Sequence, residues 1–146
     1  MVSKIYYKNP EIGLAVQMLN LIQMYPQSKC YIKSNILNWE CILRPTEGSQ
    51  KYLVRIEYKP GYMPKSYVLS PELKRYHSLP LPHVYSELPF PRLCLFYPKA
   101  KEWTGNMLLA KSIVPWICEW LFFYELSLVT GEWHADEIKH IGNKNG

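Results

Sequence analysis

The chain has 146 residues, of which 48% are hydrophobic and 20% charged, a globular composition that excludes disorder for the chain as a whole. This length predicts a single domain over residues 1–146, with 142–146 as a flexible tail. The start lacks the long apolar stretch of a secretion signal, which predicts a cytoplasmic location. The net charge of +5 is dispersed along the chain, so it is only weak support for a nucleic-acid partner.

The first predicted element is a helix over residues 10–24. Asn9-Pro10 supplies a side-chain cap followed by proline at the first helical position, where its missing N–H costs nothing. Apolar residues then recur at helical spacing until Tyr25-Pro26 ends the pattern.

From Ser28 onward the apolar period changes to two, which predicts strands. The connections are too short for crossover helices, so these strands form an antiparallel meander. A hairpin turn is expected at Thr46-Glu47-Gly48-Ser49. The four expected strands lie around Cys30–Lys33, Trp39–Leu43, Tyr52–Tyr58 and Ser66–Leu69.

Five prolines between Ser70 and Pro91 predict an irregular but ordered link. Residues 107–129 are apolar nearly all round, as expected for a helix buried against the sheet, and Thr130-Gly131 ends it. Pro115 must kink this helix or divide it in two. Its charged residues argue against a membrane span. The predicted fold class is α+β, with an N-terminal helix, a four-stranded antiparallel meander and a long helix packed on the sheet.

The four cysteines, Cys30, Cys41, Cys94 and Cys118, form no CxxC pair. We therefore expect neither a structural metal nor a disulfide framework. The chain has no GxxxxGK[ST] phosphate loop, so no ATP site and no cofactor are expected.

The order of these features resembles the ubiquitin-conjugating enzyme family over roughly residues 10–125. The strand Tyr52–Tyr58 is followed by Gly61-Tyr62-Met63-Pro64, where the family has Tyr-Pro-x-x-Pro. His83 precedes Cys94 by 11 residues, as the His-Pro-Asn histidine precedes the family's active cysteine by about ten. Trp103-Thr104-Gly105 is similar to the family's Trp-Ser-Pro turn.

The chain departs from the family at His83-Val84-Tyr85, because Tyr85 replaces the asparagine credited with holding the loop and stabilising the oxyanion. The residue that takes over this role stays open. The Trp-rich ending, residues 115–133, looks like that of small stand-alone bacterial members. Some of those are encoded in cyclic-oligonucleotide anti-phage signalling (CBASS) operons, beside a nucleotidyltransferase.

This resemblance implies that Cys94 carries a partner's C-terminus as a thioester and transfers it to a lysine amine. Thiolate suits this role because it is strongly nucleophilic. The implied donor is a cGAS-like nucleotidyltransferase, and a separate activating enzyme is either required or dispensable. His83 is expected to organise the loop by hydrogen bonds.

Each assignment also has an alternative interpretation without catalysis. Cys94 alone fits a core cysteine between two leucines, and the other three cysteines are expected in the core. The aromatic residues Trp116, Trp120, Phe123 and Tyr124 have helical spacing and are expected to pack in the core. One alternative function is a catalytically silent adaptor of the same fold. A second is a basic nucleic-acid-binding module, which is disfavoured because most tyrosines are expected to face the core.

Overall fold

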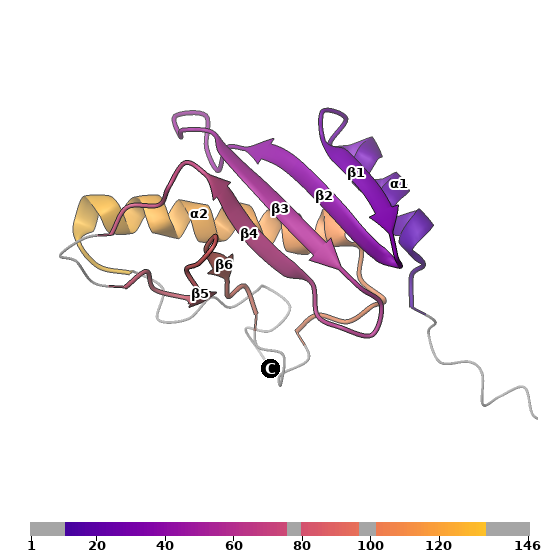
Figure 1. The fold of residues 1–146 in the computed structure, drawn as a ribbon. Helices are drawn as coiled ribbons and strands as arrows, with labels where there is room; N and C mark the ends of the chain where they lie inside the picture. The colour runs from indigo at the N-terminus through magenta and orange to yellow at the C-terminus, as the bar shows by residue number, and fades with distance from the viewer. Residues whose placement is uncertain (1–10, 76–79, 97–101, 134–146) are drawn as a thin grey trace, which may run out of the picture.

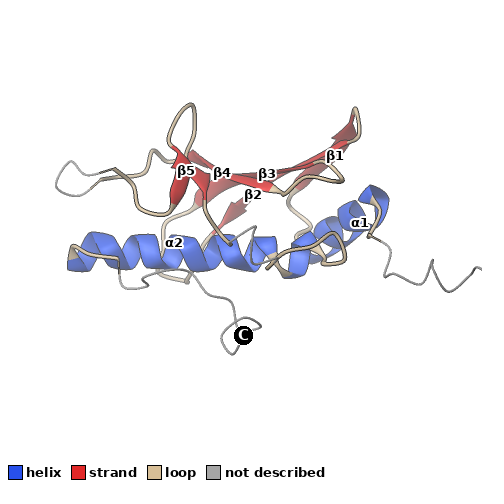
Figure 2. Ribbon diagram, turned by 90° about the horizontal axis from the view of Figure 1, so that it is seen from below, coloured by secondary structure: helices blue, strands red, loops and turns tan. Residues whose placement is uncertain are grey.

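The structure is a computed structural model that describes residues 11–75, 80–96 and 102–133. The expected helix start at Asn9-Pro10 and the tail 142–146 lie outside these residues. The described chain is α+β, as expected, with one antiparallel sheet and two α-helices on the same face of it (Figures 1 and 2).

The sheet has six strands in the order β1-β2-β3-β4-β6-β5, two more than expected. The predicted four-stranded meander is confirmed as its first part, where each strand pairs antiparallel with the next. The strands are β1 Lys29–Lys33, β2 Ile36–Leu43, β3 Tyr52–Tyr58, β4 Lys65–Ser70, β5 Val84–Ser86 and β6 Arg92–Leu93.

The alternating pattern of β2 and β3 places one set of side chains in the core. The register pairs Trp39 with Ile56 and Cys41 with Val54, so their side chains share a face and are buried together. The period of two in the sequence therefore identified the core face of both strands correctly.

The two extra strands, β5 and β6, lie where the prolines predicted irregular structure or directly after it. Both are very short, and β6 pairs with β4 only at Tyr67↔Arg92. Pro89 and Pro91 lie in the loop that joins these two strands and have no backbone N–H to donate, which limits the length of the ladder. The hairpin brings His83 opposite Cys94.

The first helix, α1, spans Leu14–Met24, so the expected start at residue 10 is wrong. Ile12 is extended and its N–H donates to the Gly105 carbonyl (2.8 Å), which anchors the chain before the helix begins. The side chains buried by α1 are Gln17 and Leu21. The Gln17 amide bonds to the main chain at residues 107 and 109, a role that apolar periodicity does not signal.

The second half of the described chain contains a short 3-10 helix, η3 (Leu109–Lys111), followed by α2 (Ile113–Thr130). The division that Pro115 predicted is confirmed, and Pro115 lies in the first turn of α2, where its missing N–H is not needed. Gly131 ends the helix with φ +85°, a conformation that glycine adopts without strain.

By length and composition alone, the continuous helical segment that ends in α2 could cross a membrane. In this structure α2 lies along the sheet (Figure 2) and buries one face in the core, as expected. Its buried side chains are Ile113, Val114, Ile117, Trp120, Leu121, Tyr124 and Ser127.

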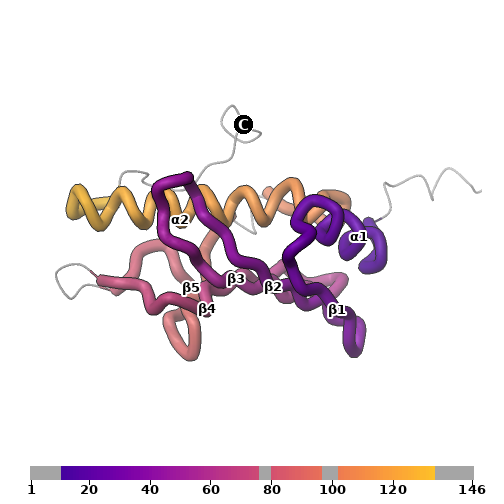
Figure 3. The backbone as a smooth tube through the Cα atoms, turned by 90° about the horizontal axis from the view of Figure 1, so that it is seen from above, coloured from indigo at the N-terminus to yellow at the C-terminus, as the bar shows by residue number. Residues whose placement is uncertain are grey.

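The turn between β2 and β3 reaches over to α2 (Figure 3). Both carboxylate oxygens of Glu125 are used there: Oε1 accepts from the Ser49 hydroxyl and Oε2 from the Tyr52 hydroxyl, each at 2.7 Å. The sequence analysis did not anticipate these neutral partners. They tie the β2–β3 turn to the C-terminal third of α2.

Candidate active site

Cys94 follows directly after β6 and is half-buried. Its backbone N–H donates to the His83 carbonyl (2.9 Å), which extends the β5–β6 ladder by one bond beyond the Val84↔Leu93 pair. The hairpin therefore holds the cysteine main chain in place and brings together the two residues singled out from the sequence, Cys94 and His83.

The His83 carbonyl accepts a second hydrogen bond from the indole Nε1 of Trp120 (3.0 Å), which is fully buried on α2. One oxygen thus connects the cysteine loop to the long helix. His83 itself has φ +54°, in the left-handed region that costs a non-glycine residue free energy. This conformation is held by the bonds that converge on its carbonyl.

The His83 side chain packs against an aromatic cluster at the end of α2. Its ring centroid lies 4.9 Å from that of Trp133, which in turn contacts Trp120 at 5.5 Å and Phe123 at 6.0 Å. The expected core packing of the aromatic residues is confirmed for Trp120 and Tyr124, which are buried, while Trp116 and Phe123 are half-buried.

A second main-chain oxygen, the carbonyl of Phe96, is contacted by side chains from both strands of the hairpin region, Tyr85 and Cys94. The Tyr85 hydroxyl donates to it at 3.4 Å, and the Cys94 Sγ lies 4.0 Å from it. The Arg92 guanidinium stacks over the Tyr85 ring, 4.7 Å from its centroid. Tyr85 therefore stands close to the thiol, in the position where the resemblance led us to look for an asparagine.

The other three cysteines are poor candidates for nucleophiles. Burial raises the pKa of the Cys30 thiol to about 11 and raises the pKa of Cys41 and Cys118 as well. A raised pKa leaves a thiol protonated near neutral pH, and the thiolate is the reactive form. Cys41 is buried, as expected, whereas Cys30 and Cys118 are half-buried against the core.

Trp103 lies in the segment that connects the cysteine loop to α2. It is buried, its ring packs edge-on against Tyr58 (5.3 Å), and its indole N–H donates to the Ser112 hydroxyl (3.0 Å) just before α2. Trp103 therefore fixes where the chain enters the helix. This is a structural role, in keeping with the turn to which the sequence was likened.

Among the described residues, no group of three or more His, Cys, Asp or Glu side chains could hold a metal ion. Eight tyrosines lie in the described part of the chain. Tyr52, Tyr58 and Tyr124 are buried, Tyr25 and Tyr67 are half-buried, and Tyr31, Tyr62 and Tyr85 are exposed. Five of the eight are therefore at least partly buried, and the three exposed ones lie on an edge strand, in a loop and on the short strand β5.

A comparison with models of known protein families shows the family of this chain. The family model of the type II CBASS E2 protein matches residues 17–141, which include the hairpin, Cys94 and all of α2. The chain belongs to the type II CBASS E2 family. A comparison with curated proteins gave no match.

Membership in this family makes the chain an E2-like protein of the CBASS system. The expected CBASS association is thereby confirmed. The sequence of this E2 protein indicated Cys94 and His83 but not the groups that hold them, Trp120 and the Phe96 carbonyl. Trp120 was visible only as part of a core stripe, and a main-chain carbonyl leaves no signature in a sequence.

Proposed function

We propose that this E2 protein carries the C-terminus of a CBASS partner protein as a thioester on Cys94 and transfers it to a lysine amine. The observation that carries the proposal is the placement of Cys94 at the end of a short hairpin, half-buried and held through its main chain by His83. The bond that fixes its main chain does not involve the sulfur, and the contact of the sulfur with the Phe96 carbonyl oxygen is long, at 4.0 Å. Family membership supports the same conclusion.

Two steps make up the reaction. The Cys94 thiolate attacks the activated carbonyl of the partner's terminal residue, supplied as an acyl adenylate or as a thioester of a separate activating enzyme. A C–S bond forms, and AMP or the other thiolate leaves. An amine then attacks the thioester, an amide bond forms, the Cys94 thiolate departs and the amine's proton passes to solvent. The proposed donor is a cGAS-like nucleotidyltransferase, so that the transfer regulates anti-phage signalling.

In this proposal His83 is a positioning residue and the Tyr85 hydroxyl takes the place of the family's asparagine. The His83 carbonyl fixes the Cys94 main chain, and its ring is engaged by Trp133. Tyr85 can donate one hydrogen bond, as the family's asparagine does, although here it donates to the Phe96 carbonyl.

The deciding measurement is the intact mass of the protein mixed with its partner and an activating system, with and without reductant. We expect a thiol-sensitive adduct for the natural protein, none for Cys94→Ala and a more stable oxyester for Cys94→Ser. Cys41→Ala and Cys118→Ala, whose thiols have raised pKa values, should retain the adduct. Equal adduct formation by Cys94→Ala would end the thioester proposal.

A second candidate is a catalytically silent adaptor that docks a partner through the same fold. The observations that favour it are the half-buried sulfur of Cys94, which points to the Phe96 carbonyl, and the replacement of the asparagine by Tyr85. An adaptor would show slow labelling of Cys94 by a thiol reagent in the folded state and unchanged partner binding in Cys94→Ala. Fast labelling together with the adduct described above would exclude it.

A further inference from the structure

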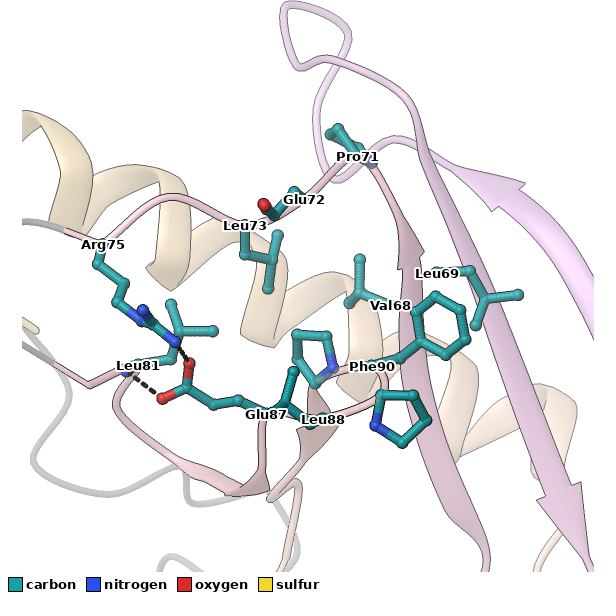
Figure 4. A pocket seen from close by; sticks show the side chains of 12 residues that line it. Val68, Leu69, Pro71, Glu72, Leu73, Arg75, Leu81, Glu87, Leu88 and Phe90 are labelled. Carbon is teal, nitrogen blue, oxygen red and sulfur yellow. Dashed lines mark hydrogen bonds and ion pairs between the residues drawn. The ribbon is translucent and has the colours of Figure 1, made fainter.

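A groove of about 680 Å³ opens between the end of β4 and the tip of the β5–β6 hairpin (Figure 4). Its inner wall is apolar and is formed by Val68, Leu73 and Leu81, all of which are almost fully buried. A volume of this size is within the range of sites that hold small ligands or peptide side chains.

The outer wall of the groove is the hairpin tip, which exposes two large apolar side chains to solvent. Leu88 is 83% exposed and Phe90 is 42% exposed, and both line the groove together with Pro89 and Pro91. Neighbouring apolar side chains that stay exposed beside a cavity are typical of interaction sites. The tip therefore extends the apolar surface of the groove outward.

The groove stays open because the hairpin pairs with β4 over only a short length. β6 meets β4 at a single register position, and the last backbone bond between them runs from the Val68 N–H to the Pro91 carbonyl (3.2 Å). Pro89 and Pro91 have no N–H to continue the ladder along β4. The result is a groove with Val68 and Leu69 of β4 on one side and the hairpin residues 87–91 on the other.

The charges at the groove are opposite in sign to the protein as a whole. Arg75 is paired with Glu87, and the other oxygen of that carboxylate accepts the Leu81 N–H (3.2 Å). The hydrogen bond from Arg75 is the main reason that the pKa of Glu87 is lowered, so this pair stays ionised and mutually neutralised. Within the described residues Glu72 makes no ion pair. The groove thus has a net negative charge in a chain whose net charge is +5.

The groove is also close to the cysteine. Pro91 lines it and precedes Cys94 by three residues, and an extended chain advances about 3.3 Å per residue, so the two Cα atoms lie at most about 10 Å apart. A peptide that leaves Cys94 in an extended conformation can therefore reach the groove within a few residues.

We propose that this groove binds the C-terminal tail of the partner whose carboxylate Cys94 carries, which rests on the function proposed above. The tail inserts an apolar side chain between Leu81 and Leu88, and a lysine or arginine beside it faces Glu72. From the spacing of Pro91 and Cys94, these two residues lie about three to five positions before the terminal carboxylate. The groove therefore selects the donor by the chemistry of its tail.

The test uses a library of random peptides displayed with a free carboxyl terminus and selected on the full-length Cys94→Ala protein, in which thioester formation is impossible. We expect enrichment of tails with an apolar residue next to a lysine or arginine at the stated distance from the end. Enrichment of acidic tails, of tails without this pair, or of none at all would overturn the proposal.

Variants then locate the binding site. With an enriched peptide as the probe in fluorescence anisotropy, Glu72→Lys should weaken binding about tenfold, since an attraction becomes a repulsion, and Glu72→Gln should weaken it less. Leu88→Ser should weaken it about fivefold through lost apolar contact. Val129→Ser is the matched control, because Val129 is 85% exposed on α2, away from the groove, and it should bind like the natural protein. Equal affinity of all these variants would place the peptide elsewhere.

The two proposals fail in different ways. Peptide selection and affinity are measured without the thiol, so a correct groove with no adduct on Cys94 would refute only the thioester chemistry. An adduct on Cys94 that forms equally well with the Glu72→Lys and Leu88→Ser variants, together with no selected tail, would refute only the groove.

Discussion

His83 contributes to the site through two parts that substitution can separate. Its carbonyl oxygen accepts from Cys94 and from Trp120, and any residue at this position supplies that oxygen. Its ring packs against the ring of Trp133, with the two centroids 4.9 Å apart. The backbone at φ +54° is a conformation that glycine adopts more readily than alanine.

We expect His83→Ala to lower the free energy of unfolding by about 1 kcal/mol, since the ring contact is lost. His83→Gly should lower it less, because glycine relieves the left-handed backbone. Both variants should form the Cys94 adduct at a rate within about threefold of the natural protein. Urea unfolding and the time course of adduct mass measure these effects.

A different result would assign chemistry to the ring. Proton transfer by a side chain contributes roughly 100-fold or more to a rate, so a loss of that size in both variants, with stability retained, contradicts a positioning role. The sequence could indicate Cys94 and His83 because their spacing and order follow a known pattern. It could not indicate that the contact runs through a main-chain oxygen, since every residue has one.

At the scale of elements, α2 is joined to the sheet at two places along its length. Trp120 bonds to the His83 carbonyl beside the cysteine, and Glu125, more than one turn further on, binds Ser49 and Tyr52 at the β2–β3 turn. The position of the cysteine loop on α2 therefore depends on contacts at both points.

Glu125→Ala should lower the free energy of unfolding by about 2 kcal/mol, because it leaves the Tyr52 hydroxyl without its acceptor in a buried position. Glu47→Ala is the control, since Glu47 is an exposed side chain in the same turn, and it should change stability by less than about 0.5 kcal/mol. Urea unfolding of both variants measures this. Equal stability of the two variants would mean that solvent replaces both hydroxyl contacts of Glu125.

Elements with strong periodicity were predictable and elements set by tertiary contacts were not. β3 has the predicted bounds, Tyr52–Tyr58, because its alternation is complete. The start of α1 was placed too early because the capping signal at Asn9-Pro10 was weighed without the Ile12–Gly105 bond, which forms between distant parts of the chain. β5 and β6 are too short to show an alternation of apolar and polar residues in the sequence, and the prolines around them favour irregular structure.

The groove beside the hairpin was missed for the same reason. Its inner wall comes from β4 and from residues after it, and its outer wall from residues 87–91, which approach only because the short hairpin folds back along the sheet. No motif in the sequence links these segments. The sequence shows the prolines of these segments, but it does not indicate that a cavity lies between the segments.

For the molecule as a whole, one core joins the sheet and both helices, and α2 supplies a large part of it. The apolar character of α2 suits a membrane span by composition, yet its two sides differ: Ile117 is completely buried while Val129 is 85% exposed. A helix in lipid has no such requirement for a sheet to cover one side, whereas a core helix loses stability when that side is truncated.

We therefore expect Ile117→Ala to lower the free energy of unfolding by about 3 kcal/mol, through lost burial and the cavity left under the sheet. Val129→Ala, a truncation of an aliphatic side chain on the exposed side, should change it by less than about 0.5 kcal/mol. Urea unfolding in detergent-free buffer measures both, and sedimentation with lipid vesicles should leave the natural protein in the supernatant. Recovery of the protein with the vesicles, or equal effects of the two truncations, would contradict α2 as a core helix, because a core helix has one side that must stay covered by β2, β3 and β4.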